Sequence, residues 1–170
     1  MNGQRPAGLS DEALSAWAHF LLFHAAVTDR LGRELVERAG MPLTWYDVLL
    51  QLDAAPDGRL RMQDLASAVV LSKSGLTRLV DRLQRAGYVD RTSCPSDRRG
   101  TFAEITASGR DALEQARPVH LRGVAEHFAA HLTDDDVAAL DRIMAALLAA
   151  EGAPAMHAAC GAEIRRPVRA

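Results

Sequence analysis

Cysteine is scarce in this chain of 170 residues, which contains Cys94 and Cys160 and no other. Two thiols are too few for the disulfide framework of a small secreted domain, and they fit a reducing compartment. No apolar run approaches the ~20 residues that cross a bilayer, and no secretory signal is recognisable. We therefore expect a soluble, cytoplasmic protein with no membrane partner.

Motifs that carry catalysis are also missing. The sequence has no glycine-rich phosphate loop, no nucleophile elbow and no pattern of paired carboxylates. Ser72 and Ser74 lack a nearby general base, and helix capping explains serines at such a position better. These absences predict a protein that is not an enzyme and needs no cofactor.

Charge is plentiful but unevenly distributed along the chain. Residues 72–99 contain seven basic and three acidic side chains, a net charge of +4. Residues 133–151 contain five acidic side chains and one basic side chain, a net charge of −4. A basic centre beside an acidic segment indicates a localised surface for a polyanion, although the whole chain carries a net charge of −2.

Helical spacing of apolar residues dominates the N-terminal part of the chain. Residues 1–9 are expected to form a flexible leader, followed by a long amphipathic helix over 10–40 that Ser10 caps. Thr44 should cap a second helix over 45–52.

The middle of the chain reads as a short strand, two helices and a hairpin. A strand over 59–61 precedes a helix over 62–68, and a second helix over 73–86 follows a brief break. After that helix the period changes to two, which predicts strands over 88–92 and 101–105 joined by a turn.

Capping signals locate the C-terminal helices. Thr106 should cap a long helix over 107–131, in which Pro118 is expected to bend or break the backbone ladder. Thr133 and the three aspartates after it predict the start of a last helix. Residues 152–170 lack periodicity and are expected to form a mobile tail.

The order of these elements defines a fold class. Two helices separated by a short break and followed by a hairpin with a basic tip form a winged helix-turn-helix. We predict a mostly α protein with a small β-hairpin wing, in which residues 41–106 form the DNA-binding lobe.

The helices over 10–40 and 107–151 carry apolar stripes that so small a lobe cannot cover. We expect them to form a dimerisation lobe with a second copy, the alternative being that they pack only on each other.

The helix over 73–86 and the hairpin tip carry the predicted contacts with DNA. Helix-turn-helix proteins read bases mainly with the N-terminal part of their second helix, and the face opposite the leucines here offers hydrogen-bond donors. At the tip, Asp97 is expected to pair with Arg99 and to leave Arg98 free to reach a phosphate or a narrow minor groove. The predicted contact residues are Ser72, Lys73, Ser74, Gly75, Thr77, Arg78, Arg82, Asp97, Arg98 and Arg99.

The stretches DLASAVVLSKSGLTRLVDRLQRAGYVDR, SDRRG and ITASGRDAL resemble the multiple-antibiotic-resistance regulator (MarR) family of winged-helix transcription factors. The resemblance covers about residues 10–150, and the DRR tip followed by I-T-x-x-G is its most specific part. It implies a homodimer that binds a pseudo-palindromic operator in double-stranded DNA, and a regulator that is usually a repressor. By position, Arg98 matches the family's minor-groove arginine and Asp97 its partner in the wing.

The resemblance also implies a small aromatic or phenolic effector bound between the lobes. Aromatic residues of the first two helices lie near the place of the family's pocket. Urate-sensing members of the family use an acid and two arginines at comparable positions, but their additional N-terminal tryptophan has no match here. Core packing is the alternative for the aromatic residues. The candidate pocket residues are Trp17, Phe20, Trp45, Asp47, Arg78 and Arg91.

Two other kinds of switch are alternatives to an organic effector. Cys94 lies among arginines of the wing, which would favour its thiolate and make a redox-responsive regulator conceivable; an inert exposed thiol is the alternative. His127 and His131 stand at a spacing that can share a metal ion, but no cysteine is near them, and we predict no metal site.

These observations favour a sequence-specific DNA-binding transcriptional regulator. The competing hypothesis is a protein-interaction module that uses the basic winged-helix face for an acidic partner. It predicts weak, non-selective binding to DNA, whereas a regulator selects its site.

Overall fold

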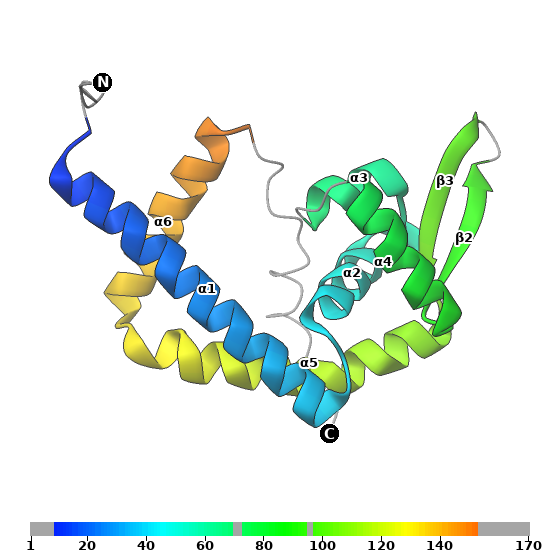
Figure 1. The fold of residues 1–170 in the computed structure, drawn as a ribbon, viewed down its shortest axis with the longest axis horizontal. Coiled ribbons are helices and arrows are strands. Elements are labelled where there is room, and N and C mark those ends of the chain that lie inside the picture. Colours follow the sequence, from blue (N-terminus) through cyan, green and yellow to red (C-terminus); the bar gives the residue numbers. More distant parts are fainter. Residues whose placement is uncertain (1–8, 70–72, 95–96, 153–170) are drawn as a thin grey trace, which may run out of the picture.

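The computed structural model describes residues 9–69, 73–94 and 97–152, without the side chains of Lys73 and of residues 93–94 and 97–100. Figure 1 shows helices that surround a small sheet at one side of the molecule and extend away from it at the other. The elements in chain order are α1 (Asp11–Ala39), α2 (Leu43–Ala54), the 3-10 turn η1 (Pro56–Gly58), β1 (Arg59–Arg61), α3 (Met62–Ala68), α4 (Lys73–Arg85), β2 (Val89–Cys94), β3 (Asp97–Ile105), α5 (Ala107–His127), the 3-10 turn η2 (Ala129–His131) and α6 (Asp134–Ala150).

The winged lobe consists of α2, α3, α4 and an antiparallel sheet with the strand order β1-β3-β2. Its core is closed by apolar side chains from every one of these elements, from the end of α1 and from the first half of α5. The largest fully buried side chains are Tyr46, Leu35, Leu49, Leu52, Leu65, Leu76, Leu83 and Leu113. The predicted mostly α fold with a small β wing is confirmed.

The wing is longer than the sequence pattern predicts. The expected strands over 88–92 and 101–105 are present, but β2 continues to Cys94 and β3 begins at Asp97. The pairing register shifts between Ser93 and Cys94, which marks a bulge near the tip. The turn-forming residues near the tip led to strands that were predicted too short, because a bulge allows such residues to remain within a paired β-ribbon.

Caps define the ends of the long helices as predicted. The Ser10 hydroxyl accepts a hydrogen bond from the backbone N–H of Ala13 at 3.1 Å. At α6, Thr133 accepts from the backbone N–H of Asp136, while the Asp136 carboxylate accepts from the backbone N–H of Thr133. The hydrogen bonds from Thr133 lower the pKa of Asp136 below its usual value and keep this reciprocal cap charged.

Two predicted boundaries were wrong. α2 begins at Leu43 with Pro42 at its N-cap, because the Pro42 carbonyl already accepts from the backbone N–H groups of Trp45 and Tyr46; Thr44 lies inside the helix. α5 ends at His127, because Phe128 leaves helical geometry at φ −129° and ψ −67°, and residues 129–131 form a separate 3-10 turn.

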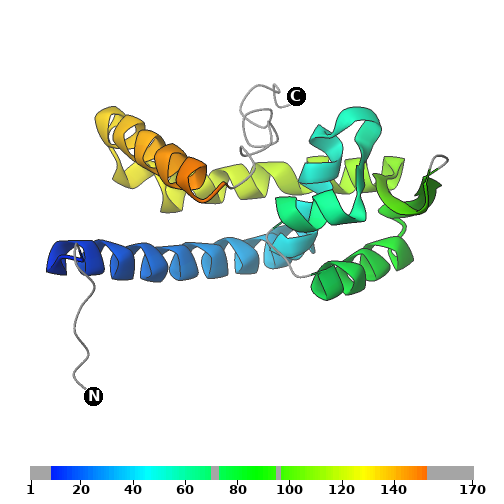
Figure 2. The same cartoon turned by 90° about the horizontal axis from the view of Figure 1, so that it is seen from above.

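The remaining helices lie outside the winged lobe. α1 packs along the second half of α5, where a Cβ on Gly123 would collide with the side chain of Leu31. No residue of α6 is buried, and although this helix crosses α1 in the view of Figure 1, the view from above in Figure 2 shows the two helices apart. Across the described residues, no helix is both long and apolar enough to span a membrane.

Candidate nucleic-acid interface

α4 has two chemically distinct faces. Leu76, Leu79, Val80 and Leu83 are at most 2% exposed and anchor the helix to the lobe core. The opposite face is exposed and carries Ser74, Thr77, Arg78, Arg82 and Arg85. The surface that the sequence predicts for DNA therefore faces solvent and offers hydroxyl and guanidinium donors along the helix.

The arginines of this face are available to a ligand. Arg78, Arg82 and Arg85 have no ion-pair partner among the residues that the structure describes. Together with Asp81 they line a shallow hollow in the surface of α4. Arginines without an internal partner suit phosphate and guanine contacts, since each guanidinium presents a planar fork of donors.

Arg91 connects the wing to α4, and its predicted part in an effector pocket stays a prediction. From strand β2 its Nη1 lies 2.7 Å from Asp81 Oδ1, and its Nη2 donates to the backbone carbonyl of Thr77 at 3.2 Å. One side chain of the wing thus contacts two successive turns of α4. Sequence reasoning missed this brace, because Asp81 and Arg91 belong to different elements and no spacing rule connects them.

The wing tip can be placed only through its backbone. Asp97, Arg98 and Arg99 belong to the start of β3, at the end of the wing that points away from the helices (Figure 1). The side chains of Lys73, Asp97, Arg98 and Arg99 lie outside the described residues, as does all of Ser72. The predicted pairing of Asp97 with Arg99 stays a prediction.

The predicted effector residues form separate groups in one chain. Trp17 stacks on Phe20 in the exposed first half of α1, with ring centroids 5.9 Å apart. Trp45 is half-buried in the winged lobe and meets Tyr88 edge to face at 6.0 Å. Asp47 lies on the same helix as Trp45, whereas Arg91 is bound to α4.

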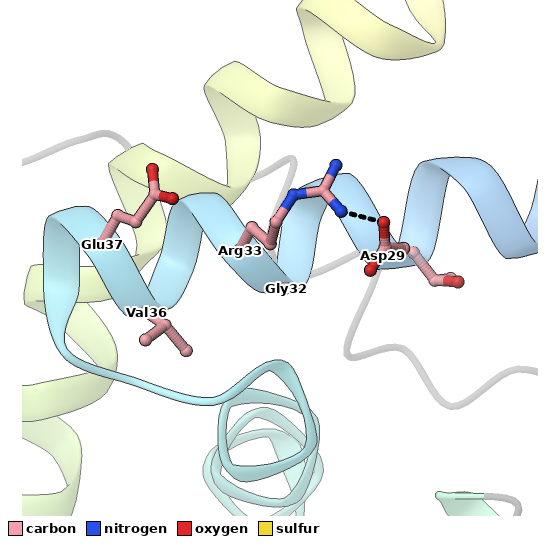
Figure 3. A pocket seen from close by; sticks show the side chains of 6 residues that line it. Asp29, Gly32, Arg33, Val36 and Glu37 are labelled. Atoms are coloured by element: carbon pink, nitrogen blue, oxygen red, sulfur yellow. Dashed lines mark hydrogen bonds and ion pairs between the residues drawn. The ribbon is translucent and has the colours of Figure 1, made fainter.

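A hollow on α1 contains none of the predicted effector residues. Figure 3 shows it open to the surface, with the carboxylate of Asp29 paired to the guanidinium of Arg33. Its lining residues are Thr28, Asp29, Gly32, Arg33, Val36 and Glu37.

Of the two histidines considered for a metal site, only His127 lies on α5. His127 Nε2 lies 2.7 Å from Glu34 Oε1 and joins α5 to α1, while His131 belongs to the 3-10 turn that follows. No group of three possible ligands for a metal occurs among the described residues. The side chain of Cys94 and all of Cys160 lie outside them, so the redox hypothesis stays a prediction.

A helix-turn-helix with an exposed basic second helix and an adjoining wing defines the class of winged-helix DNA-binding proteins. Comparison with known proteins narrows this class. The model of the MarR family matches residues 39–100. Sco3205, a MarR family transcriptional regulator from Streptomyces coelicolor solved in complex with DNA, is 35% identical. Its match covers 88% of this chain and 92% of that one, with a TM-score of 0.78.

Two curated relatives agree with this match. The multiple antibiotic resistance protein MarR of Salmonella typhimurium is 27% identical over 120 residues, which are 71% of this chain and 82% of that protein. The transcriptional repressor YetL of Bacillus subtilis is 36% identical over 75 residues, 44% of this chain and 45% of its own. The chain belongs to the MarR family of transcriptional regulators, which are not enzymes.

Proposed function

We propose that two copies of this chain bind a pseudo-palindromic operator in double-stranded DNA, with α4 of each copy in one of two adjacent major grooves. The observation that carries the proposal is the exposed basic face of α4 opposite its buried leucines. An α-helix fits the major groove, where side-chain donors reach base edges and phosphates.

The position of each side chain along α4 suggests its role. Ser74, Thr77 and Arg78 lie in the N-terminal half, which approaches base edges in helix-turn-helix proteins. Arg82 and Arg85 lie in the last turns and suit the phosphate backbone. From their positions in the sequence, we also assign Ser72, Lys73 and Gly75 to the group that approaches base edges. We assign Arg98 of the wing to the adjacent minor groove.

Exposed apolar side chains support the homodimer. Trp17 and Leu22 on α1 are 59% and 69% exposed, and Leu147 on α6 is 56% exposed. A helix without a buried residue, such as α6, gains little stability from its own chain, since packing supplies most helical stability. A second copy would bury both helices and place the two winged lobes side by side.

The proposed regulator is a repressor that a small aromatic or phenolic compound releases from DNA. Support comes from the family and from YetL, whose name describes a repressor. The effector site would lie between the dimerisation helices and the winged lobe, next to Trp45 and Asp47 of α2.

Selection of bound sequences from random duplex DNA tests the proposal. We expect two related half-sites about one helical turn apart, and an affinity that falls steeply with salt because arginines displace counterions. Compounds that lower affinity for the selected site then identify the effector class. Binding without any sequence preference would contradict the proposal and favour a module for acidic protein partners.

A further inference from the structure

α5 belongs to both parts of the molecule and bends between them. Figure 1 shows the helix changing direction near its middle, where Pro118 lies within the continuous helix Ala107–His127. Proline lacks the N–H that would donate to the carbonyl of Glu114. The helix therefore resists bending less at this point. The sequence prediction of a bend is confirmed, and a break does not occur.

Charged side chains hold the half of α5 before the bend to the end of α2. Asp53 forms an ion pair with Arg110 through Oδ1, and its Oδ2 lies 3.8 Å from Nη2 of Arg117. The same nitrogen of Arg117 lies 3.2 Å from the Glu114 carboxylate. The Asp53 and Arg117 side chains are 10% and 6% exposed, so solvent screens this contact little.

α2 also contacts α5 beyond the bend. The ring of Tyr46 lies against that of His120, with centroids 4.4 Å apart, and Tyr46 is fully buried. Tyr46 and Asp53 stand about two helical turns apart on α2. One rigid helix of the winged lobe thus touches α5 on both sides of Pro118.

The far half of α5 belongs to the other part of the molecule. There Gly123 allows close approach to α1, and His127 pairs with Glu34 of α1. The winged lobe therefore contacts α5 on both sides of the bend, while α1 holds the far end of α5, and a change in the bend angle would move α4 relative to α1.

We propose that the contacts of α2 on both sides of Pro118 fix the bend angle of α5. In this proposal Asp53, Arg110 and Arg117 are positioning residues that set the separation of the two α4 helices in the dimer. The inference rests on the proposed function and adds to it the determinant of half-site spacing. Spacing is a sharp readout, because one added base pair moves a half-site by about 3.4 Å and rotates it by about 34° around the duplex.

The test measures affinity for a series of duplexes in which the selected half-sites are separated by spacers from two base pairs shorter to two longer. Pro118→Ala restores a backbone hydrogen bond, and Arg110→Gln removes the ion pair of Asp53 with its more exposed partner. Both variants should therefore remain folded dimers. Asp29→Asn, which removes an exposed ion pair from α1, is the matched control. Circular dichroism and sedimentation verify fold and dimer.

We expect wild type and Asp29→Asn to share one optimum, with affinity falling at least tenfold for a change of one base pair. In Pro118→Ala the optimum should shift or broaden until neighbouring spacers differ less than threefold, and Arg110→Gln should broaden it less. Asp53→Asn should show the largest effect if it folds; if it does not, the other two variants decide. Folded variants with the wild-type profile overturn this inference alone, whereas a wild type without an optimum overturns the proposed function.

Discussion

Gly123 is the residue that fixes how closely α1 and α5 approach. Its missing side chain leaves room for Leu31, and a Cβ there would also lie 3.3 Å from Glu34 Oε2. Gly123→Ala should lower the free energy of unfolding by about 1–2 kcal/mol, because overpacking outweighs the gain in helix propensity. Urea unfolding measures this difference.

Gly32→Ala is the control for that substitution. It also lies in a helix, but its Cβ would meet only Leu43 Cβ at 3.9 Å, an ordinary contact. We expect unchanged or higher stability, by up to about 1 kcal/mol. Equal losses at the two positions would contradict the close approach at Gly123.

Arg78 is the exposed arginine of α4 nearest to its N-terminal end, which we propose contacts bases. Arg78→Ala should lower affinity for the selected operator about tenfold to a hundredfold and relax preference at one position of each half-site. Arg122→Ala, which removes an exposed arginine from α5, should preserve base preference. Selection and titration with both variants measure the effect; an unaltered preference in Arg78→Ala would place that side chain away from the bases.

Among the elements, the junction of α1 and α5 is expected to weaken in acid. The hydrogen bond from His127 is the main cause that lowers the pKa of Glu34. A carboxylate with a lowered folded pKa stabilises the fold above its unfolded pKa of about 4.3, and this contribution disappears as pH falls through the folded pKa. Stability should therefore decrease below about pH 4.3.

Glu34→Gln isolates this contribution. The variant should be less stable than wild type at pH 6, and the difference should shrink as the pH falls through the acidic range, because protonated Glu34 and glutamine are both uncharged. Urea unfolding between pH 6 and pH 3 measures both curves. A difference that stays constant with pH would show that the Glu34 carboxylate contributes no charge-dependent stability.

Local signals predicted the elements well where the chemistry is local. Ser10 and Thr133 cap helices through side chains close in sequence, and the leucines of α4 repeat at helical spacing. Boundaries that depend on geometry escaped prediction, as at Phe128, where the backbone turns without a proline or glycine.

The interface was predictable to a similar extent. The exposed donors of α4 follow from helical periodicity alone. The ion pairs of Arg91 with Asp81 and of Arg110 with Asp53 join residues of separate elements, and only tertiary packing brings these residues together. Such contacts need three-dimensional information, because no periodic pattern encodes them.

For the whole molecule, the exposed apolar side chains of α1 and α6 are the basis of the proposed homodimer. Leu147→Glu should weaken the dimer roughly a hundredfold, about 2.8 kcal/mol, since it places a charge in an apolar interface. Ala86→Glu changes an exposed residue of the winged lobe and should leave association unchanged. Sedimentation equilibrium compares them; a monomeric wild type would contradict the dimer.

The most direct measurement of the central claim maps α4 on DNA with a chemical nuclease. A variant with Thr77→Cys, Cys94→Ser and Cys160→Ser carries an iron chelate that cuts nearby backbone, and Arg122→Cys in the same background is the control label. We predict two clusters of cleavage about 10 base pairs apart within the operator from the label at position 77 and none from the label at position 122. Equal or absent cleavage from both labels would show that α4 does not lie in the groove.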